Sequence, residues 1–285
     1  MLSNCRPEMS PLIRCPRHCP QARVRLFCFP YSGAGASIFY AWSDALPATI
    51  EVCPVQLPGR GTRLAEPPFN RLEPLVQSVA QGLLPCLDRP FAFFGHSLGA
   101  LVSFELTRYL RRQMGLSPVY LFVSAHSAPQ ISGRDSPIHA LPESEFVEQL
   151  RCLNGMSDAV LKNAELMQLL LPILRADFSV CETYVYQVDE PLDCPISALG
   201  GLRDEHVSRE SLDAWRVHTR ASFTLRMFPG DHFYLNTDRL LLLRTIAREL
   251  SNSSVVALTG SSDPDVKTLE VSEVLSSNSL EAISS

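Results

Sequence analysis

Ser97 lies in a sequence setting that could turn its hydroxyl into a nucleophile. The segment Gly95-His96-Ser97-Leu98-Gly99 matches the pattern Gly-x-Ser-x-Gly. An apolar run at 91–94 precedes this segment, and leucines at helical spacing follow it. A strand that turns sharply into a helix exposes such a serine, and the helix N-terminus favours negative charge that develops there. We therefore predict that Ser97 attacks an acyl carbonyl; the alternative is an ordinary glycine-serine turn.

A serine hydroxyl needs a base that removes its proton, and seven histidines compete for that role. When the nucleophile sits in such a turn, the acid and then the base follow it along the chain, so the base should come after a late strand. His232 fits this order because it follows the strand-like run 223–228. His206 is the main competitor. We predict His232 as the base.

The base in turn needs a carboxylate that holds its tautomer and stabilises the imidazolium. Asp204 follows the strand-like run 196–199, and a loop at the carboxyl end of a strand is a suitable place for such a group. Asp231 is too close to His232 in sequence to reach back to it easily. We predict Asp204 as the acid and keep Glu205 as the alternative.

Two backbone N–H groups are expected to hold the negative oxygen of a tetrahedral intermediate. One belongs to Leu98, the residue after the nucleophile. The other should come from the glycine-containing loop 29–35, which follows the first strand-like run. We predict Ala34 as this second donor, with Gly33 as the alternative.

Six apolar, strand-like runs must provide the scaffold that positions these residues. The runs are 24–29, 50–55, 91–94, 119–124, 196–199 and 223–228. Helical patterns separate them, and mostly apolar strands between helices indicate a parallel sheet covered on both faces. Together with the serine motif, this alternation predicts an α/β fold of the α/β-hydrolase type.

The interval between the fourth and fifth runs breaks the alternation. It holds about seventy residues, far more than one crossover helix needs. Segments 143–153 and 157–187 have helical patterns. We therefore predict a helical lid, inserted at about 130–192 above the edge of the sheet that carries the chemistry.

The predicted domain covers 23–251 and has a segment of different composition on either side. Residues 1–22 are rich in proline and cysteine without periodicity, and 252–285 are rich in serine and acidic residues. Such composition is typical of disordered tails. We predict both segments to be disordered.

Composition narrows the choice of partners and compartment. The net charge is −5, which is unlike the basic footprint of a nucleic-acid-binding protein. No run reaches the ~18 apolar residues of a membrane helix, and 1–22 lacks the apolar core of a secretory signal. Nine cysteines, several in apolar runs, indicate free thiols in a reducing compartment. We expect a cytoplasmic monomer without metal or cofactor; a metal site at Cys15 and Cys19 is the alternative, and it lacks a second ligand pair.

Seven stretches of the chain together resemble a known family. They are 29–35, 56–60, 91–99, 171–178, 201–204, Trp215 with His218 and Thr219, and 228–235. These motifs resemble type II thioesterases, the stand-alone editing enzymes of non-ribosomal peptide and polyketide synthases. They are also similar to the medium-chain acyl-carrier-protein thioesterases of fatty-acid synthesis. The resemblance spans roughly 23 to 250.

The resemblance implies the same triad of Ser97, Asp204 and His232. Ser32, where alanine is frequent, and Asp231, where glycine is frequent, depart from the pattern without touching the triad. The implied reaction is hydrolysis of aberrant acyl groups from the phosphopantetheine arm of a carrier protein. Alternatives are the release of medium-chain fatty acids, an oxygen-ester carboxylesterase, an acyltransferase, or a binding protein without activity.

Overall fold

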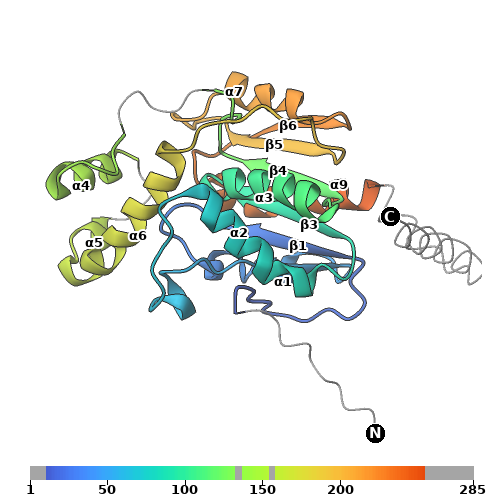
Figure 1. Ribbon diagram of the computed structural model, residues 1–285, viewed down its shortest axis with the longest axis horizontal. Coiled ribbons are helices and arrows are strands. Elements are labelled where there is room, and N and C mark those ends of the chain that lie inside the picture. Colours follow the sequence, from blue (N-terminus) through green and yellow to red (C-terminus); the bar gives the residue numbers. More distant parts are fainter. Residues whose placement is uncertain (1–10, 132–136, 154–157, 254–285) are drawn as a thin grey trace, which may run out of the picture.

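A computed structural model describes residues 11–131, 137–153 and 158–253, and six parallel strands form one sheet in this part of the chain (Figure 1). The strands are β1 (Val24–Phe29), β2 (Ile50–Pro54), β3 (Phe91–His96), β4 (Tyr120–Ser124), β5 (Ile196–Gly201) and β6 (Phe223–Phe228). Each strand agrees with a predicted run to within two residues at either end. The predicted parallel α/β architecture is therefore confirmed.

The order of the strands across the sheet is β2-β1-β3-β4-β5-β6. Every residue of β1 to β5 is buried, as expected for parallel strands that are covered on both faces. The winding direction reverses between β1 and β3, and ligands of such sheets bind beyond the carboxyl ends of the strands at this point. Because β1 leads into the loop at 30–35 and β3 leads to Ser97, two predicted parts of the site meet there.

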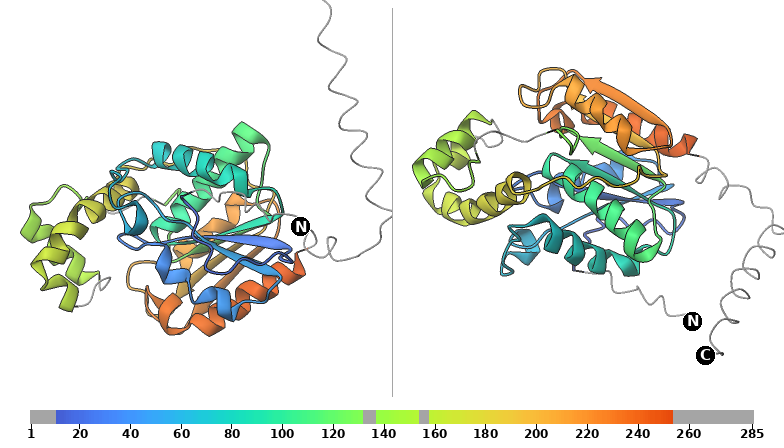
Figure 2. Two further views of the ribbon diagram at one scale, coloured as in Figure 1. Left: turned by 90° about the horizontal axis from the view of Figure 1, so that it is seen from below. Right: turned by 45° about the horizontal axis from the view of Figure 1, so that its top comes forward.

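Helices cover both faces of the sheet. The helices α2 (Leu72–Leu83) and α3 (Leu98–Met114) belong to one buried apolar cluster, and α1 (Trp42–Ala45) and α9 (Arg239–Asn252) belong to the other. Figure 2 shows the two pairs on opposite sides of the strands. The short helices are α7 (Arg209–Asp213), α8 (Tyr234–Thr237) and the 3₁₀ turns Ala36–Phe39, Gly61–Arg63, Leu84–Cys86 and Ala214–His218.

Between β4 and β5, where the insertion is predicted, the described residues form three further helices. They are α4 (Glu143–Cys152), α5 (Asp158–Leu161) and α6 (Ala164–Glu182). They project beyond the end of the sheet and share a small apolar cluster that includes Phe146 and Leu174 (Figures 1 and 2). The position of these helices, beyond the carboxyl ends of the strands, makes them neighbours of the predicted site.

The segment 11–22 differs from the predicted tail because it packs on the edge strand β2. Leu12 and Ile13 are only 3% and 4% exposed, and Ile13 forms an antiparallel bridge with Val55. An edge strand has unpaired backbone groups, which this segment covers. Two apolar residues between prolines carry no periodicity, so sequence patterning could not detect the contact. Residues 1–10 and 254–285, the rest of the predicted tails, lie outside the described residues.

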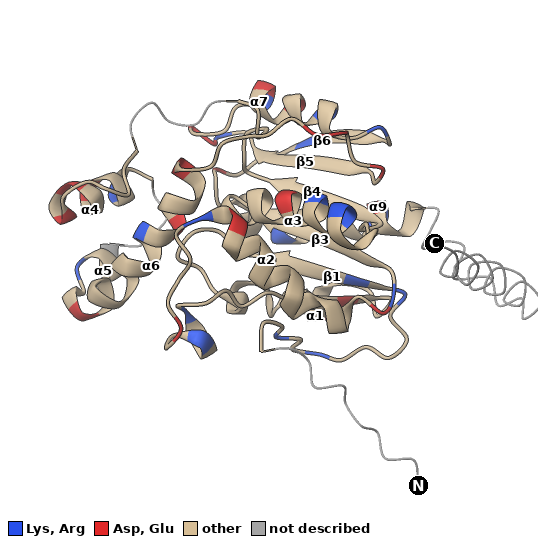
Figure 3. Cartoon of the chain, viewed as in Figure 1, with Lys and Arg blue, Asp and Glu red and all other residues tan. Residues whose placement is uncertain are grey.

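In the ribbon of Figure 3, positions of Lys and Arg alternate along the chain with positions of Asp and Glu rather than being gathered in one segment. Within the described ranges, no helix is long and apolar enough to cross a membrane. The same ranges contain no group of three or more His, Cys, Asp or Glu side chains placed to hold a metal ion. Residues of the Cys15–Cys19 motif contact protein groups instead: Cys15 Sγ lies 3.1 Å from Cys53 Sγ, and His18 pairs with Glu51.

Candidate active site

Ser97 occupies the sharp turn between β3 and α3. Its backbone has φ 54° and ψ −118°, a conformation that costs a residue with a side chain on the order of 1–3 kcal/mol. The Ser97 N–H donates to the Ser124 carbonyl at 2.8 Å, which ties the turn to β4. Ser97 is partly exposed, whereas every other residue of 91–100 is buried. The turn therefore presents this one side chain outward.

Two glycines make the turn possible by close backbone approach. A Cβ at Gly95 would lie 2.1 Å from the Gly99 carbonyl oxygen. A Cβ at Gly99 would lie 2.2 Å from the Phe29 carbonyl oxygen at the end of β1. The start of α3 thus rests directly on the backbone of the loop that follows β1, which brings this loop next to the nucleophile turn.

His232 and Asp204 form a hydrogen-bonded pair. His232 Nδ1 lies 2.8 Å from Asp204 Oδ2, and the Asp204 carboxyl is fully buried. Its second oxygen accepts the backbone N–H groups of His206 at 2.9 Å and Val207 at 3.1 Å. Burial opposes ionisation, but the hydrogen bond from His232, the charge of His232 and the two N–H donors outweigh it and lower the pKa of Asp204. The carboxyl is therefore an anion that orients the imidazole.

The pair lies beside the nucleophile turn. The ring of His96, the residue before Ser97, is 5.4 Å from the His232 ring between centroids. Among the described residues, no hydrogen bond joins His232 to the Ser97 hydroxyl; such bonds are often long in enzymes without substrate. His206, the competing base, gives its backbone N–H to Asp204, and its ring is 6.3 Å from that of His232. Asp204 therefore orients His232 rather than His206.

The loop after β1 does not use its N–H groups as predicted. The Ala34 N–H donates to the Tyr31 carbonyl at 3.0 Å, and the Gly33 N–H donates to Asp177 Oδ2 at 2.7 Å. Both groups are occupied, so the prediction of Ala34, and its alternative Gly33, does not hold in this structure. The N–H groups of Tyr31 and Ser32 have no acceptor among the described residues. Sequence alone does not reveal how this turn closes on itself.

Tyr31 is the loop residue whose surroundings connect it to the triad. Its ring lies 5.8 Å from the His96 ring and 5.1 Å from the Phe233 ring, next to His232. Leu98 supplies the other predicted donor: as the first residue of α3, it has no carbonyl one helical turn before it to accept its N–H. The N–H groups of Tyr31 and Leu98, which have no acceptor in the part of the chain that the structure describes, thus belong to the two segments that meet at Gly99.

His96 takes part in a buried polar network instead of acting as a base. His96 Nδ1 lies 2.8 Å from Ser124 Oγ, which also contacts the Tyr234 hydroxyl. Burial, followed by the charge of His232, lowers the pKa of His96 well below its ordinary value. The ring is therefore neutral, and its hydrogen bond to Ser124 helps to hold the turn that contains Ser97.

A second ion pair near the site was missed by sequence reasoning. Arg60 and Asp177 are 5% and 2% exposed and join the loop after β2 to helix α6. Asp177 lies on the apolar face of α6 between Leu174 and Val180. A charged residue at that helical spacing is the signal that could have found it.

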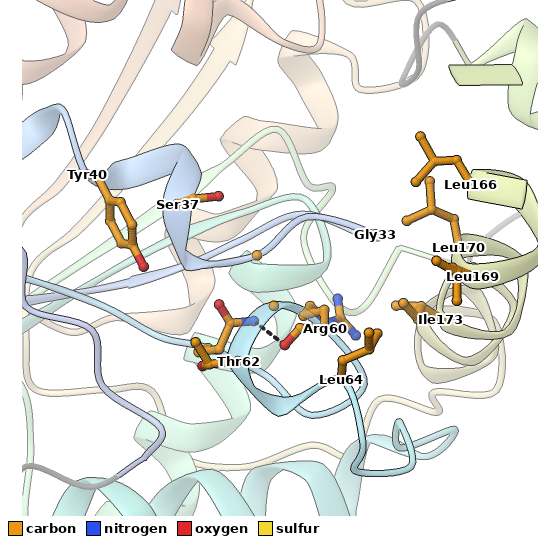
Figure 4. A pocket seen from close by; sticks show the side chains of 13 residues that line it. Gly33, Ser37, Tyr40, Arg60, Thr62, Leu64, Leu166, Leu169, Leu170 and Ile173 are labelled. Atoms are coloured by element: carbon orange, nitrogen blue, oxygen red, sulfur yellow. Dashed lines mark hydrogen bonds between the residues drawn. The ribbon is translucent and has the colours of Figure 1, made fainter. Parts of the chain in front are cut away.

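A cavity of about 320 Å³ opens beside the loop after β1 (Figure 4). On one side it is lined by Gly33, Tyr40, Arg60 and Leu64, and on the other by Leu166, Leu169, Leu170 and Ile173 of α6. The leucines make this wall apolar. The inserted helix therefore forms part of a hollow close to the loop that carries the free N–H groups.

Comparisons with known proteins show which family the chain resembles. The family model described as the thioesterase domain matches residues 24–251. The gramicidin S biosynthesis protein GrsT of Aneurinibacillus migulanus is 49% identical over 229 residues, covering 80% of this chain and 90% of that protein. The thioesterase PikA5 of Streptomyces venezuelae is 40% identical over 218 residues, covering 76% and 77%. The solved structure of the thioesterase RedJ from the prodiginine pathway of Streptomyces coelicolor has a TM-score of 0.75 and 42% identity, covering 80% of this chain and 86% of that chain.

Proposed function

The chain belongs to the thioesterase family, and we propose that it hydrolyses acyl thioesters on the phosphopantetheine arm of carrier proteins. In this proposal it removes aberrant acyl groups from a non-ribosomal peptide or polyketide synthase. The relatives named for gramicidin S and prodiginine biosynthesis support this role. The partner is an acyl or peptidyl carrier protein, and the enzyme acts on it as a cytoplasmic monomer.

The proposed chemistry has two halves that use the same base. Ser97 attacks the thioester carbonyl while His232 takes the hydroxyl proton, and Asp204 stabilises the imidazolium. The carbonyl oxygen becomes an oxyanion that the N–H groups of Leu98 and Tyr31 hold. The carbon–sulfur bond then breaks, and the protonated His232 gives its proton to the departing thiolate, which leaves as the free thiol and returns His232 to its neutral form; a thiol leaves readily because its pKa, ordinarily about 8.5, is low. His232 next activates a water molecule, which releases the acid and restores Ser97.

One observation carries the proposal: the His232–Asp204 pair, whose carboxyl is buried and whose imidazole is partly exposed, lies at the same end of the sheet as the strained Ser97 turn. Strain in a residue other than glycine persists only where the surrounding structure maintains it, and such positions cluster at functional sites. We further propose that α4 to α6 act as a lid over the acyl group, since α6 lines the cavity beside the loop after β1.

The test is a panel of substrates with matched acyl groups. Short, medium and long acyl groups would be presented on a carrier protein, on coenzyme A and as nitrophenyl esters, with and without an acceptor alcohol. We expect the highest kcat/KM on the carrier protein and no transfer to the alcohol. Preference for oxygen esters, or transfer to the alcohol, would overturn the proposal. Strong selection for medium-chain fatty acyl groups would favour the fatty-acid-releasing alternative.

The role of the nucleophile is tested on the same panel. Ser97→Ala should lower kcat by at least about 10⁴-fold, because the remaining groups cannot form the acyl-enzyme. Ser251→Ala, on the exposed surface of α9, removes a hydroxyl far from the site and should leave kcat unchanged. Phosphonylation of Ser97 by a fluorophosphonate, with loss of fluoride, gives a second readout when the labelled peptide is detected by mass spectrometry.

A further inference from the structure

Arg60 and Asp177 make a buried, two-point ion pair across the site. Arg60 Nη1 lies 2.6 Å from Asp177 Oδ2, and Arg60 Nη2 lies 2.7 Å from Asp177 Oδ1. The two residues are 117 positions apart in sequence. Burying a charge pair has a large desolvation penalty, and such a pair is weak evidence for a purely stabilising role. The pair also forms hydrogen bonds to a third segment of the chain, which indicates that it positions this segment.

That third segment is the loop after β1. Asp177 Oδ2 also accepts the Gly33 N–H at 2.7 Å, and Arg60 Nη1 donates to the Ala34 carbonyl at 3.3 Å. The pair therefore holds neighbouring residues of the loop, one through its N–H group and the other through its carbonyl. The Gln56 side chain links the same two loops, because its amide oxygen accepts the Ala36 N–H and its amide nitrogen donates to the Arg60 carbonyl.

We propose that Arg60 and Asp177 are positioning residues that hold the loop after β1 in the shape that directs the Tyr31 N–H toward the oxyanion. The Gly33 N–H donates to Asp177, and the Ala34 N–H donates to the Tyr31 carbonyl. These two hydrogen bonds fix the conformation of the turn. Gly33 has φ 78°, and a Cβ there would lie 2.7 Å from Leu174, so α6 packs directly on this turn. This inference rests on the proposed function.

The same contacts divide α6 into two functional parts. The part around Leu174 and Asp177 is fixed to the loop after β1 and acts as an anchor. The part before Pro172 carries Leu166 and Leu169, which line the cavity together with Ile173 just after the proline. Pro172 has no N–H to donate to the carbonyl one helical turn earlier, so the two parts are joined by a weakened turn of helix.

Asp177→Asn and Arg60→Lys are the test variants. Each keeps a polar side chain of similar size but removes the two-point charge pair. The matched control is Glu51→Gln, which breaks another buried pair, Arg25–Glu51, at the start of the edge strand, away from the nucleophile turn. Each variant is compared with the wild type for kcat and KM on a nitrophenyl ester and for unfolding in urea.

We expect Asp177→Asn and Arg60→Lys to lower kcat by about 10- to 100-fold with little change in KM, because an oxyanion donor acts in the transition state. Glu51→Gln should lose stability but keep kcat within about threefold. Two outcomes would overturn the inference: kcat within threefold of wild type in both site variants, or an equal loss of kcat in Glu51→Gln at equal loss of stability.

The two site variants and the choice of substrate keep the result interpretable. If Asp177→Asn does not fold, Arg60→Lys, which retains the positive charge, decides the question alone. The nitrophenyl ester reports on the triad whichever acyl donor the enzyme prefers in the cell. Failure on carrier-bound thioesters would therefore contradict the proposed function, whereas unchanged ester kcat in the variants would contradict the positioning role.

Discussion

At the scale of single residues, the site depends on which backbone and side-chain groups remain available for chemistry. Four neighbouring N–H groups, at residues 31 to 34, look equivalent in sequence. Two of them have protein acceptors and two have none among the described residues. The carboxylate of Asp204 is similarly divided, with one oxygen for His232 and the other for two backbone N–H groups. Both arrangements lead to predictions for individual atoms.

Replacing the Tyr31 amide by an ester tests the proposed oxyanion donor. The α-hydroxy analogue of tyrosine at position 31 removes the N–H and keeps the ring against His96 and Phe233. We expect kcat for thioester cleavage to fall by about 10²- to 10³-fold, as for loss of one oxyanion donor. The same analogue at Tyr109, inside α3, removes a structural helical N–H and should lower stability by about 1 kcal/mol with kcat retained. Equal kcat in the two variants would contradict the assignment.

Asp204→Asn tests the acid of the triad. The amide oxygen can still accept the N–H groups of His206 and Val207, so the fold should persist. The amide nitrogen would face His232 Nδ1 and hold the wrong tautomer, so kcat should fall by about 10³- to 10⁴-fold. Glu205→Gln, at the exposed neighbouring carboxyl, should change kcat by less than about twofold. A larger loss in Glu205→Gln than in Asp204→Asn would assign the acid to Glu205. Steady-state kinetics and circular dichroism suffice for both.

At the scale of elements, the turn from β3 into α3 is set by how closely α3 approaches the end of β1. Local pattern predicts the strand, the glycines and the helix, and the structure adds the reason for Gly99, whose Cα faces the Phe29 carbonyl. For the inserted helices, local pattern predicts less of the arrangement and the tertiary structure decides more. Its helical character is readable in sequence, whereas its attachment to the loop after β1 through Asp177 is a contact between distant segments.

Gly99→Ala tests this close approach. The added methyl would meet backbone atoms of Phe29 and Pro30, which have little room to move inside the sheet. We expect a loss of about 3 kcal/mol or more in the free energy of unfolding, together with a lower kcat because the Leu98 N–H shifts. Gly115→Ala is the matched control: it ends α3 at φ 64° with nothing within 4 Å, so only the backbone penalty of about 1–2 kcal/mol applies. Similar losses in urea unfolding would refute the steric argument.

At the scale of the whole molecule, several histidines are buried in their neutral form. Burial lowers the pKa of His96 and His126, and burial together with the positive charge of Arg108 lowers the pKa of His218 to about 4. The unfolded chain takes up these protons near pH 6.5. As the pH falls from 6.5 toward 4, the unfolded state therefore binds more protons than the folded state, and stability declines.

His218→Gln should reduce this acid sensitivity. The glutamine keeps a polar group near Gln130 but has no proton to take up. Between pH 7 and pH 5, the variant should lose about 1–2 kcal/mol less stability than the wild type, allowing for partial solvent screening. Urea unfolding at a series of pH values measures this difference. The control Ser251→Ala, on the exposed surface of α9, changes no titratable group and should leave the pH dependence unchanged. A parallel decline in wild type and His218→Gln would show that His218 is not involved.

Sequence by itself determined the features that depend on short stretches of chain. Continuous apolar runs placed the six described strands to within two residues. The glycine-flanked Ser97 could be recognised because a strand, a tight turn and a helix each favour particular residue types locally. The candidate partners His232 and Asp204 followed from chain order, and the structure brings these two side chains together.

Only the tertiary structure decided which groups are free to act and which are already in use. It showed that the Ala34 N–H is occupied whereas the Tyr31 N–H has no acceptor among the described residues, that Arg60 pairs with Asp177, and that 11–22 covers the edge strand rather than forming a tail. Each of these depends on a contact between specific atoms, in most cases from segments far apart in the chain. Hydrogen bonds between residues far apart in the sequence depend on how the whole sheet and its helices pack, so the local residue pattern does not predict them.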